Sequence, residues 1–244
     1  MKLSIFPFAK IHDNKIHLWN IITSDISDQK LQVYYDLLSK DEKLRASKFR
    51  FKKDRKTYIV ARGVLRKLSG YYLKEKPEAI VFEYEQYGRP KYKNHTHLKF
   101  NVSHSGDSII IGFVKEYEFG VDVEEIKEDF DVIDIAHNFF SKQEIAKLDS
   151  LPKTEQFIAF YRCWTRKESF IKAKGSGLSF PLHLFSMSLH TDDSAELLET
   201  QWNALEKKKW KVFTFIPQKG YRAAISVYGK VDTVAYLDWS NYKD

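Results

Sequence analysis

The sequence has a single cysteine, Cys163, among its 244 residues, so no disulfide can form within the chain. No apolar run approaches the roughly 20 residues that a membrane-spanning helix needs, and the apolar core near the N-terminus is too short for a secretory signal. The sequence also lacks a P-loop, a Gly-x-Gly-x-x-Gly turn and a cluster of histidine and cysteine spaced for zinc. We therefore expect a soluble cytoplasmic protein in which Cys163 is a buried core thiol.

Positive charge is what the chain has in excess, with 40 lysine and arginine residues against 33 aspartate and glutamate residues and a formal net charge of +7. This balance is typical of a lysine-rich solvated surface, and it also fits an anionic ligand, an acidic protein partner or nucleic acid. Nucleic acid is the weakest of these, because no basic stretch interleaved with aromatic residues forms a recognisable module. With 43% hydrophobic residues, the chain can build a full core in one large or two small domains.

The hydrophobic pattern changes between strand and helix periods along the chain, which predicts an α+β protein. The elements expected in the first half are a strand over 15–21, helices over 27–51 and 53–70, a strand entering a turn at Gly88, a strand before a turn near 105, and a hairpin of 109–114 with 119–126. Ser27 or Asp28 is the expected N-cap of the first helix, and Ser69 with Gly70 is the expected end of the second.

The second half repeats this order of elements. It predicts one or two helices over 130–150, a long helix that ends at Gly175, and closing strands within 182–190, 209–217 and 221–229. Each half then has a long helix followed by a three-strand segment. We predict two similar α+β halves, 1–115 and 116–244, packed as a pseudo-dimer, each with a small, mainly antiparallel sheet and a long helix.

Two carboxylates lie close together in GVDVEEI, residues 120–126. The two-residue period of a strand places Asp122 and Glu124 on the face opposite the valines, with their Cα atoms roughly 6.5–7 Å apart. Two carboxylates at this spacing can bind one cation between them, although an isolated pair of this kind is more often part of an exposed strand face.

Glu168 lies in the long helix, within WTRKESFIKAKGSG. A period of 3.6 residues puts it on the same stripe as Trp164 and therefore beside the core. A buried ionised carboxylate costs several kcal/mol unless it is paired or binds a metal. One alternative is a plain ion pair with Lys172, one turn further on. The other is a site in which Asp122, Glu124 and Glu168 hold Mg²⁺, a cation that prefers oxygen ligands.

A third motif, FNVSHSGD at residues 100–107, places a small polar turn after a strand. The hydroxyls of Ser103 and Ser105, the His104 ring and the backbone N–H groups could hold phosphate oxygens there. The alternative is a β-turn that carries a surface histidine.

The order of these motifs resembles the 4′-phosphopantetheinyl transferase superfamily, in its surfactin-synthetase type. FNVSHSG is followed by GVDVEEI, then by FFSKQE, then by WTRKESFIKAKGSGLS. The family pattern is G-[IV]-D-[IV]-E and, some forty residues on, W-[ST]-x-K-E-[SA]-x-x-K, and both blocks are complete here. QYGRP resembles the Y-G-x-P element of the family. The resemblance covers roughly residues 41–186.

The resemblance implies an enzyme that moves the 4′-phosphopantetheine arm of coenzyme A to a serine of an acyl or peptidyl carrier protein, with Mg²⁺, and releases adenosine 3′,5′-bisphosphate. It implies Asp122, Glu124 and Glu168 as metal ligands. Catalytic positions match Glu168, Lys172 and Glu144. Contacts to coenzyme A match Lys43, Arg45, Arg89, Ser103, His104 and Lys172. The resemblance also implies a monomer with its active site between the two halves, the second half carrying the metal acids.

Two other functions fit part of these motifs. A Mg²⁺-dependent phosphohydrolase would share the three acids but has no need of the histidine turn. A non-catalytic module that binds coenzyme A or a carrier would not need intact acids. If the chain is a transferase, we expect part of segment 127–140, with Phe130, Val132, Ile133 and Ile135, to dock the carrier by apolar contact, unless these side chains only cover the core.

Overall fold

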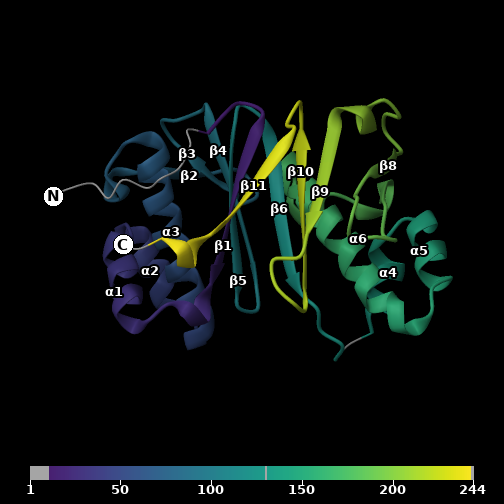
Figure 1. The fold of residues 1–244 in the computed structure, drawn as a ribbon, viewed down its shortest axis with the longest axis horizontal. Coiled ribbons are helices and arrows are strands. Elements are labelled where there is room, and N and C mark those ends of the chain that lie inside the picture. The colour runs from purple at the N-terminus through teal and green to yellow at the C-terminus, as the bar shows by residue number, and fades with distance from the viewer. Residues whose placement is uncertain (1–10, 130, 243–244) are drawn as a thin grey trace.

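Two β-sheets stand side by side in the middle of the molecule, and helices cover the outer side of each (Figure 1). The structure is a computed structural model that describes residues 11–129 and 131–242. Its helices are α1 (Asp28–Leu37), α2 (Lys40–Ser47), α3 (Lys52–Leu73), α4 (Val132–Phe139), α5 (Lys142–Asp149) and α6 (Lys153–Lys174). Its strands are β1 (Lys15–Ile22), β2 (Phe82–Tyr84), β3 (Pro90–Tyr92), β4 (Leu98–Ser105), β5 (Ser108–Lys115), β6 (Glu118–Glu125), β7 (Phe185–Met187), β8 (Leu197–Thr200), β9 (Trp210–Phe215), β10 (Tyr221–Tyr228) and β11 (Thr233–Asp238).

The first sheet has the strand order β11-β1-β5-β4, and the second has the order β6-β10-β9. Pairing is antiparallel except between β1 and β11, which run parallel. Helices α1 to α3 lie beside the first sheet and α4 to α6 beside the second (Figure 1). The expectation of an α+β protein with small, mainly antiparallel sheets and a long helix on each side is confirmed.

The inner faces of the two sheets share one core. Ile16 and Leu18 of β1 meet Ile110 of β5, and Val121 and Val123 of β6 come from the opposite sheet. This core lies between the two sheets, and the valines of the GVDVEEI motif point into it, as their alternation predicts. Asp122 and Glu124 are thereby directed to the other face of β6, which is the face that α6 covers.

Two of the helices differ from the expected ones, the first by a break and the second by its end. Ser27 caps α1 by accepting a hydrogen bond from the Lys30 backbone, as expected, but the segment 27–51 is broken into α1 and α2. Ser39 begins the second of them, and its backbone N–H donates to Glu42 Oε2 at 3.0 Å, which closes a capping box. Helix α3 continues past Gly70 to Leu73, because the left-handed residue that ends it is Lys74.

Helix α6 matches its expected end. Gly175 follows the last helical residue with φ 69°, a left-handed conformation that glycine adopts without a Cβ clash. The two helices α4 and α5 precede it, and β7, β9 and β10 supply the closing strands that the sequence predicts.

The expected hairpin of 109–114 with 119–126 is wrong in its pairing. Both strands exist, but β5 pairs with β1 and β4, whereas β6 pairs with β10. The connection at 116–117 sends the chain from one sheet into the facing one, so β5 and β6 meet through side chains of the shared core. Alternation of apolar residues shows which face of a strand is buried, and it carries no information about which strand pairs with it.

The last strand returns to the first sheet. β11 lies parallel to β1, and Trp239 after it is buried in the core between α1, α3 and that sheet. The Trp239 indole donates to the Tyr34 hydroxyl of α1 at 2.9 Å. Segments from both ends of the described chain therefore build the first half. The division of the chain at residue 115 stays a prediction.

Candidate active site

Helix α6 lies directly on β6, and this contact assembles the site. Gly120 makes it possible, because a Cβ at this position would lie 2.3 Å from the Ser169 carbonyl oxygen and 2.4 Å from the Ala173 nitrogen. The close approach brings Glu168 and Lys172 of α6 over the side of β6 that carries Asp122 and Glu124. The structure thus brings together the residues of two motifs that lie some forty positions apart.

Asp122 is the most deeply buried acid of the site, with 2% of its surface exposed. Its Oδ1 accepts a hydrogen bond from Lys172 Nζ at 2.6 Å and another from Ser103 Oγ at 2.9 Å. Its Oδ2 is buried without a hydrogen-bond partner among the residues that the structure describes. One oxygen is therefore held by the protein, and the other can still take a ligand.

Glu124 and Glu168 flank this pair. Glu124 Oε2 accepts from Ser105 Oγ at 2.7 Å. Glu168 is buried beside the core, as its stripe on α6 predicts, and its Oε1 has no hydrogen-bond partner within the described part of the chain. The ion pair of Lys172 is with Asp122 and not with Glu168, so the alternative of a plain helix pair between Glu168 and Lys172 is wrong.

Burial raises the pKa of all three acids. Burial, followed by the charge of Asp122, raises the pKa of Glu168 to about 7, against the opposing charge of Lys172. Burial, followed by the charge of Asp122, also raises the pKa of Glu124 to about 7. Burial raises the pKa of Asp122 above its ordinary value, against the opposing effect of Lys172. Buried like charges of this kind are stabilised by a cation.

The donor set fits a hard divalent cation. Within residues 11–129 and 131–242, no three histidine, cysteine or carboxylate side chains already stand in position around a metal. The two orphaned oxygens, Asp122 Oδ2 and Glu168 Oε1, nevertheless belong to acids whose charges act on each other. Carboxylate oxygens suit Mg²⁺, which keeps several other ligands for water or phosphate.

A cavity of about 320 Å³ opens beside these acids. Its lining comes from the turn 87–90 between β2 and β3, from Asn101 and Val102 of β4, and from the end of α6 with Glu168 and Lys172. Arg89 fixes the turn, because its guanidinium donates to the Phe119 carbonyl at 3.2 Å and to the Ala173 carbonyl at 3.4 Å. The cavity therefore joins elements of both halves of the chain.

Comparison with known proteins gives this arrangement a family. A family model described as 4′-phosphopantetheinyl transferase superfamily matches residues 118–226, and a model of the N-terminal part of a 4′-phosphopantetheinyl transferase matches residues 25–114. The 4′-phosphopantetheinyl transferase HetI of Nostoc sp. (strain PCC 7120) is 30% identical over 226 residues, which cover 91% of this chain and 92% of HetI. This chain belongs to the 4′-phosphopantetheinyl transferase superfamily.

Two relatives from Bacillus subtilis support the same assignment. The 4′-phosphopantetheinyl transferase Sfp of strain 168 is 33% identical over 70% of this chain and 75% of its own length. The 4′-phosphopantetheinyl transferase ffp is 32% identical over 82% of this chain and 86% of its own length. The family and the enzyme class expected from the sequence motifs are confirmed. No helix in the described ranges combines the length and apolar character needed to cross a membrane.

Ser103 and His104 of this superfamily member lie at the edge of the site. The Ser103 hydroxyl donates to Asp122 Oδ1 at 2.9 Å, and its expected contact with coenzyme A stays a prediction. The His104 side chain is exposed on the surface of β4. Desolvation, followed by the charge of Lys172, lowers the pKa of His104 below its ordinary value.

The two basic residues of α2 that were expected to contact coenzyme A lie outside the lining of the cavity at the acids. Lys43 stands over the ring of Tyr35, with Nζ 5.4 Å from the centroid, and Arg45 stands over the ring of Tyr58 at 5.5 Å. Neither residue lines the cavity beside the acids. Their expected contact with coenzyme A stays a prediction.

Glu144 lies in a buried hydrogen-bond network, and the catalytic role expected for it stays a prediction. It is 2% exposed, and it accepts from the backbone N–H of Ser141 at 2.7 Å and of Met187 at 2.6 Å. Lys167 Nζ lies 2.8 Å from its Oε2. Lys167 also donates to the carbonyls of Leu182 and Phe185, at 2.9 and 2.7 Å. This buried network fastens α5 and α6 to β7, and Glu144 does not line the cavity at the acids.

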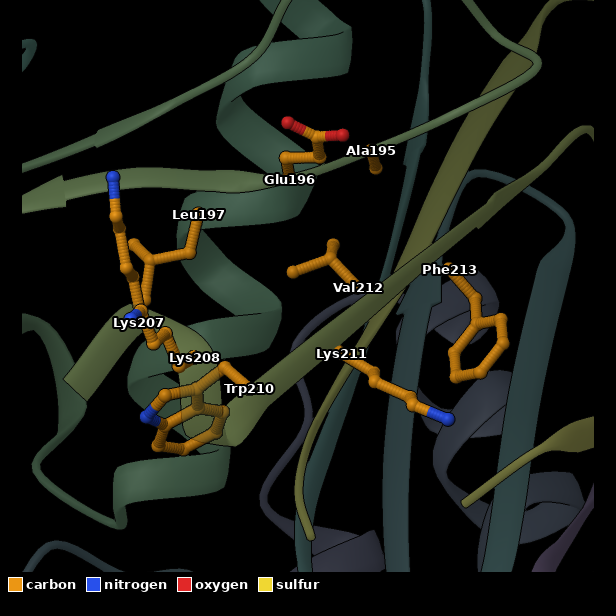
Figure 2. A pocket seen from close by; sticks show the side chains of 9 residues that line it. All are labelled: Ala195, Glu196, Leu197, Lys207, Lys208, Trp210, Lys211, Val212 and Phe213. Atoms are coloured by element: carbon orange, nitrogen blue, oxygen red, sulfur yellow. The ribbon is translucent and has the colours of Figure 1, made fainter. Parts of the chain in front are cut away.

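A second hollow of about 380 Å³ lies between β8, β9 and the residues that precede β9 (Figure 2). Lys207, Lys208 and Lys211 rim it, and Val212 lies in its middle. None of the site residues expected from the sequence lines it. Asn101 and Lys167 are not among the residues predicted from the sequence, although the alternation of polar residues in FNVSHS places Asn101 on one face of β4 with Ser103 and Ser105.

Proposed function

We propose that this chain transfers the 4′-phosphopantetheine arm of coenzyme A to a serine of an acyl or peptidyl carrier protein, with Mg²⁺ as its metal. The observation that carries the proposal is the meeting of Asp122, Glu124, Glu168 and Lys172 beside one cavity between the two halves. Transfer at a pyrophosphate needs positioning and charge neutralisation more than covalent help from the protein, and this site offers both.

In this proposal Asp122, Glu124 and Glu168 hold the metal. Mg²⁺ would supply positive charge to the pyrophosphate oxygens when bound. Lys172 sits beside these acids with a flexible four-carbon side chain, so it can move from Asp122 to a phosphate oxygen. Arg89, Ser103, His104, Lys43 and Arg45 remain the candidates for contacts to the rest of coenzyme A, and Ser103 also holds Asp122 through its hydroxyl.

The transfer step needs a base. The serine oxygen of the carrier forms a bond to the β-phosphorus of coenzyme A, and the bond from that phosphorus to the adenosine bisphosphate oxygen breaks. The proton of the serine goes to Glu168, directly or through a water. A carboxylate with a pKa of about 7 is well matched to accept a proton near neutral pH.

The carrier is the expected transient partner. A net charge of +7 steers acidic proteins toward the enzyme and makes the association rate depend on salt. In the segment proposed to dock it, Val132 is buried, whereas Ile133 and Ile135 are half-buried against the core of the second half. Phe139 is 45% exposed and extends this surface, and Phe130 lies outside the described residues. A monomeric cytoplasmic enzyme remains our expectation.

Mass spectrometry of a panel of apo carrier proteins tests the function. Incubation with coenzyme A and Mg²⁺ should add one phosphopantetheine to a carrier serine and release an equal amount of adenosine 3′,5′-bisphosphate. Release of the bisphosphate without any carrier would favour the phosphohydrolase. Binding of coenzyme A or a carrier with neither product would favour the non-catalytic module.

A further inference from the structure

The two sheets are joined at β4 and β6 by side chains. Both strands are edges, β4 of the first sheet and β6 of the second. Three side chains at alternate positions of β4, which we call the β4 ladder, accept the N–H groups of alternate β6 residues. Asn101 Oδ1 accepts from Val121 at 2.9 Å, Ser103 Oγ accepts from Val123 at 3.3 Å, and Ser105 Oγ accepts from Glu125 at 3.1 Å.

The same ladder reaches the acids of the site. A serine hydroxyl has one proton to donate and two lone pairs that accept. In Ser105 a lone pair takes the Glu125 N–H, and the proton goes to Glu124 Oε2 at 2.7 Å. In Ser103 the lone pairs take Val123 N–H and Lys172 Nζ, so its proton goes to Asp122 Oδ1. Each hydroxyl therefore fixes the strand and its acid at once.

The turn after Ser105 is held by residues of the second sheet and by the segment that follows β1. Gly106, at φ 55°, packs so closely that a Cβ would lie 2.4 Å from both Glu125 Oε2 and the Tyr221 hydroxyl. The Asp107 N–H donates to that hydroxyl at 3.0 Å, and the Asp107 carboxylate accepts from the Ser24 N–H at 3.0 Å. The turn that follows Ser105 is therefore fixed by Ser24, just after β1, and by neighbours in β6 and β10.

We infer that Ser105 is a positioning residue of the transferase: its hydroxyl holds Glu124 in the orientation in which this acid binds the divalent cation. The inference rests on the proposed function, since it assigns a role toward the proposed metal. Hydrogen bonds that orient a ligating carboxylate typically change metal affinity by 10–100-fold when they are lost. Ser105 is the informative member of the β4 ladder, because Ser103 also contacts Lys172.

The test compares Ser105→Ala with Ser105→Thr, which keeps the hydroxyl and suits a strand. Ser108→Ala is the matched control, because Ser108 pairs with Ser105 across the β4–β5 turn while its own hydroxyl donates to Asn20. Calorimetric titration of each purified protein with Mg²⁺, and with Mn²⁺ as a second probe, measures binding without turnover. Carrier loading is measured over a range of Mg²⁺ concentrations, and thermal melts report stability.

We expect Ser105→Ala to weaken metal binding by roughly 10-fold, to raise the Mg²⁺ concentration needed for half-maximal loading by a similar factor, and to leave the KM for coenzyme A unchanged. Ser105→Thr and Ser108→Ala should bind metal like the wild type. A Ser105→Ala protein with a lower Tm but wild-type metal affinity would overturn the inference and leave only a structural role. Wild-type affinity and Tm would overturn it as well. A wild-type protein that binds no metal and loads no carrier would overturn the proposed function together with this inference.

Discussion

Lys172 Nζ lies 2.6 Å from Oδ1 of Asp122, although the sequence spacing places Lys172 one helical turn from Glu168. The lysine therefore balances the strand acid, and the helix acid keeps an oxygen without a partner among the described residues. This asymmetry separates the roles of the two acids. Asp122 has a built-in counter-ion, whereas Glu168 depends on a metal or a proton for its neutralisation.

Glu168→Gln should fold, bind coenzyme A and lose most turnover. The substitution keeps the shape of the side chain but removes its charge and basicity, and loss of a general base lowers rates by roughly 10²–10⁴-fold. Carrier-loading rates and coenzyme A titrations measure the two effects. Glu155→Gln, an exposed glutamate in the first turn of the same helix, is the control and should load carrier at the wild-type rate. Normal loading by Glu168→Gln would contradict its role as base.

Lys172→Met should bind Mg²⁺ more tightly than the wild type when coenzyme A is absent. In the wild type the ammonium group and a cation compete for Asp122, and a hydrogen bond between charged groups contributes about 1.5–3 kcal/mol, so we expect an increase of roughly 10-fold. The variant should also bind coenzyme A more weakly and turn over more slowly, because a positive charge near the phosphates is lost. Titration at pH 8 keeps the acids ionised.

Weaker Mg²⁺ binding by Lys172→Met would contradict this prediction. If Lys172→Met binds Mg²⁺ more weakly, Lys172 supports the metal site and does not compete with it. Asp122→Asn gives the second reference point, since it removes the charge that both cations share. It should bind little Mg²⁺ and should lose roughly 10²-fold or more in rate.

The raised pKa of Glu168 makes the stability of the metal-free protein depend on pH. Its folded-state pKa is about 7, against an ordinary value of 4.5, so the folded chain binds more protons than the unfolded chain between these values. The stability that this group contributes is complete below pH 4.5 and is lost as the pH rises through 7. Glu168→Gln should therefore exceed the wild type in Tm at pH 8, and the difference should shrink at pH 5.

The size of this effect follows from the shift. A change of one pKa unit corresponds to about 1.4 kcal/mol, and 1 kcal/mol moves the Tm of a chain of this size by about 2–4 °C. We expect a difference of several degrees at pH 8, and Mg²⁺ should reduce it by stabilising the wild type. A Tm difference that is the same at pH 5 and pH 8 would show that Glu168 keeps an ordinary pKa.

Glu144→Gln tests the structural position of that acid. The substitution leaves Lys167 buried without its counter-ion, which typically destabilises a fold by about 3–5 kcal/mol. We expect a Tm lower by roughly 10 °C and near-normal carrier loading at temperatures at which the variant stays folded. A catalytic Glu144 would give the reverse pattern, with lost loading and an unchanged Tm. Glu155→Gln again serves as the control for a change of charge alone.

Local patterns in the sequence determined much of this protein. The alternation in GVDVEEI placed Asp122 and Glu124 on one face of β6, and the helical stripe placed Glu168 beside the core. The end of α6 at Gly175 followed from the left-handed conformation that glycine tolerates. These features depend on the backbone period and on a residue's own conformational freedom, so a few neighbouring residues contain all the information. The motifs built on them also identified the family.

The partners of these elements were decided by the tertiary structure alone. β6 pairs with β10 and not with β5, and β11 returns to lie parallel to β1. Lys172 turns to Asp122, and Glu144 is buried with Lys167. Each of these contacts joins residues far apart in the chain. The free energy of each contact depends on which sheet edges and helix faces meet when the two halves pack. The hydrophobic period of a single strand or helix is the same for every partner, so it does not show which partner will be found.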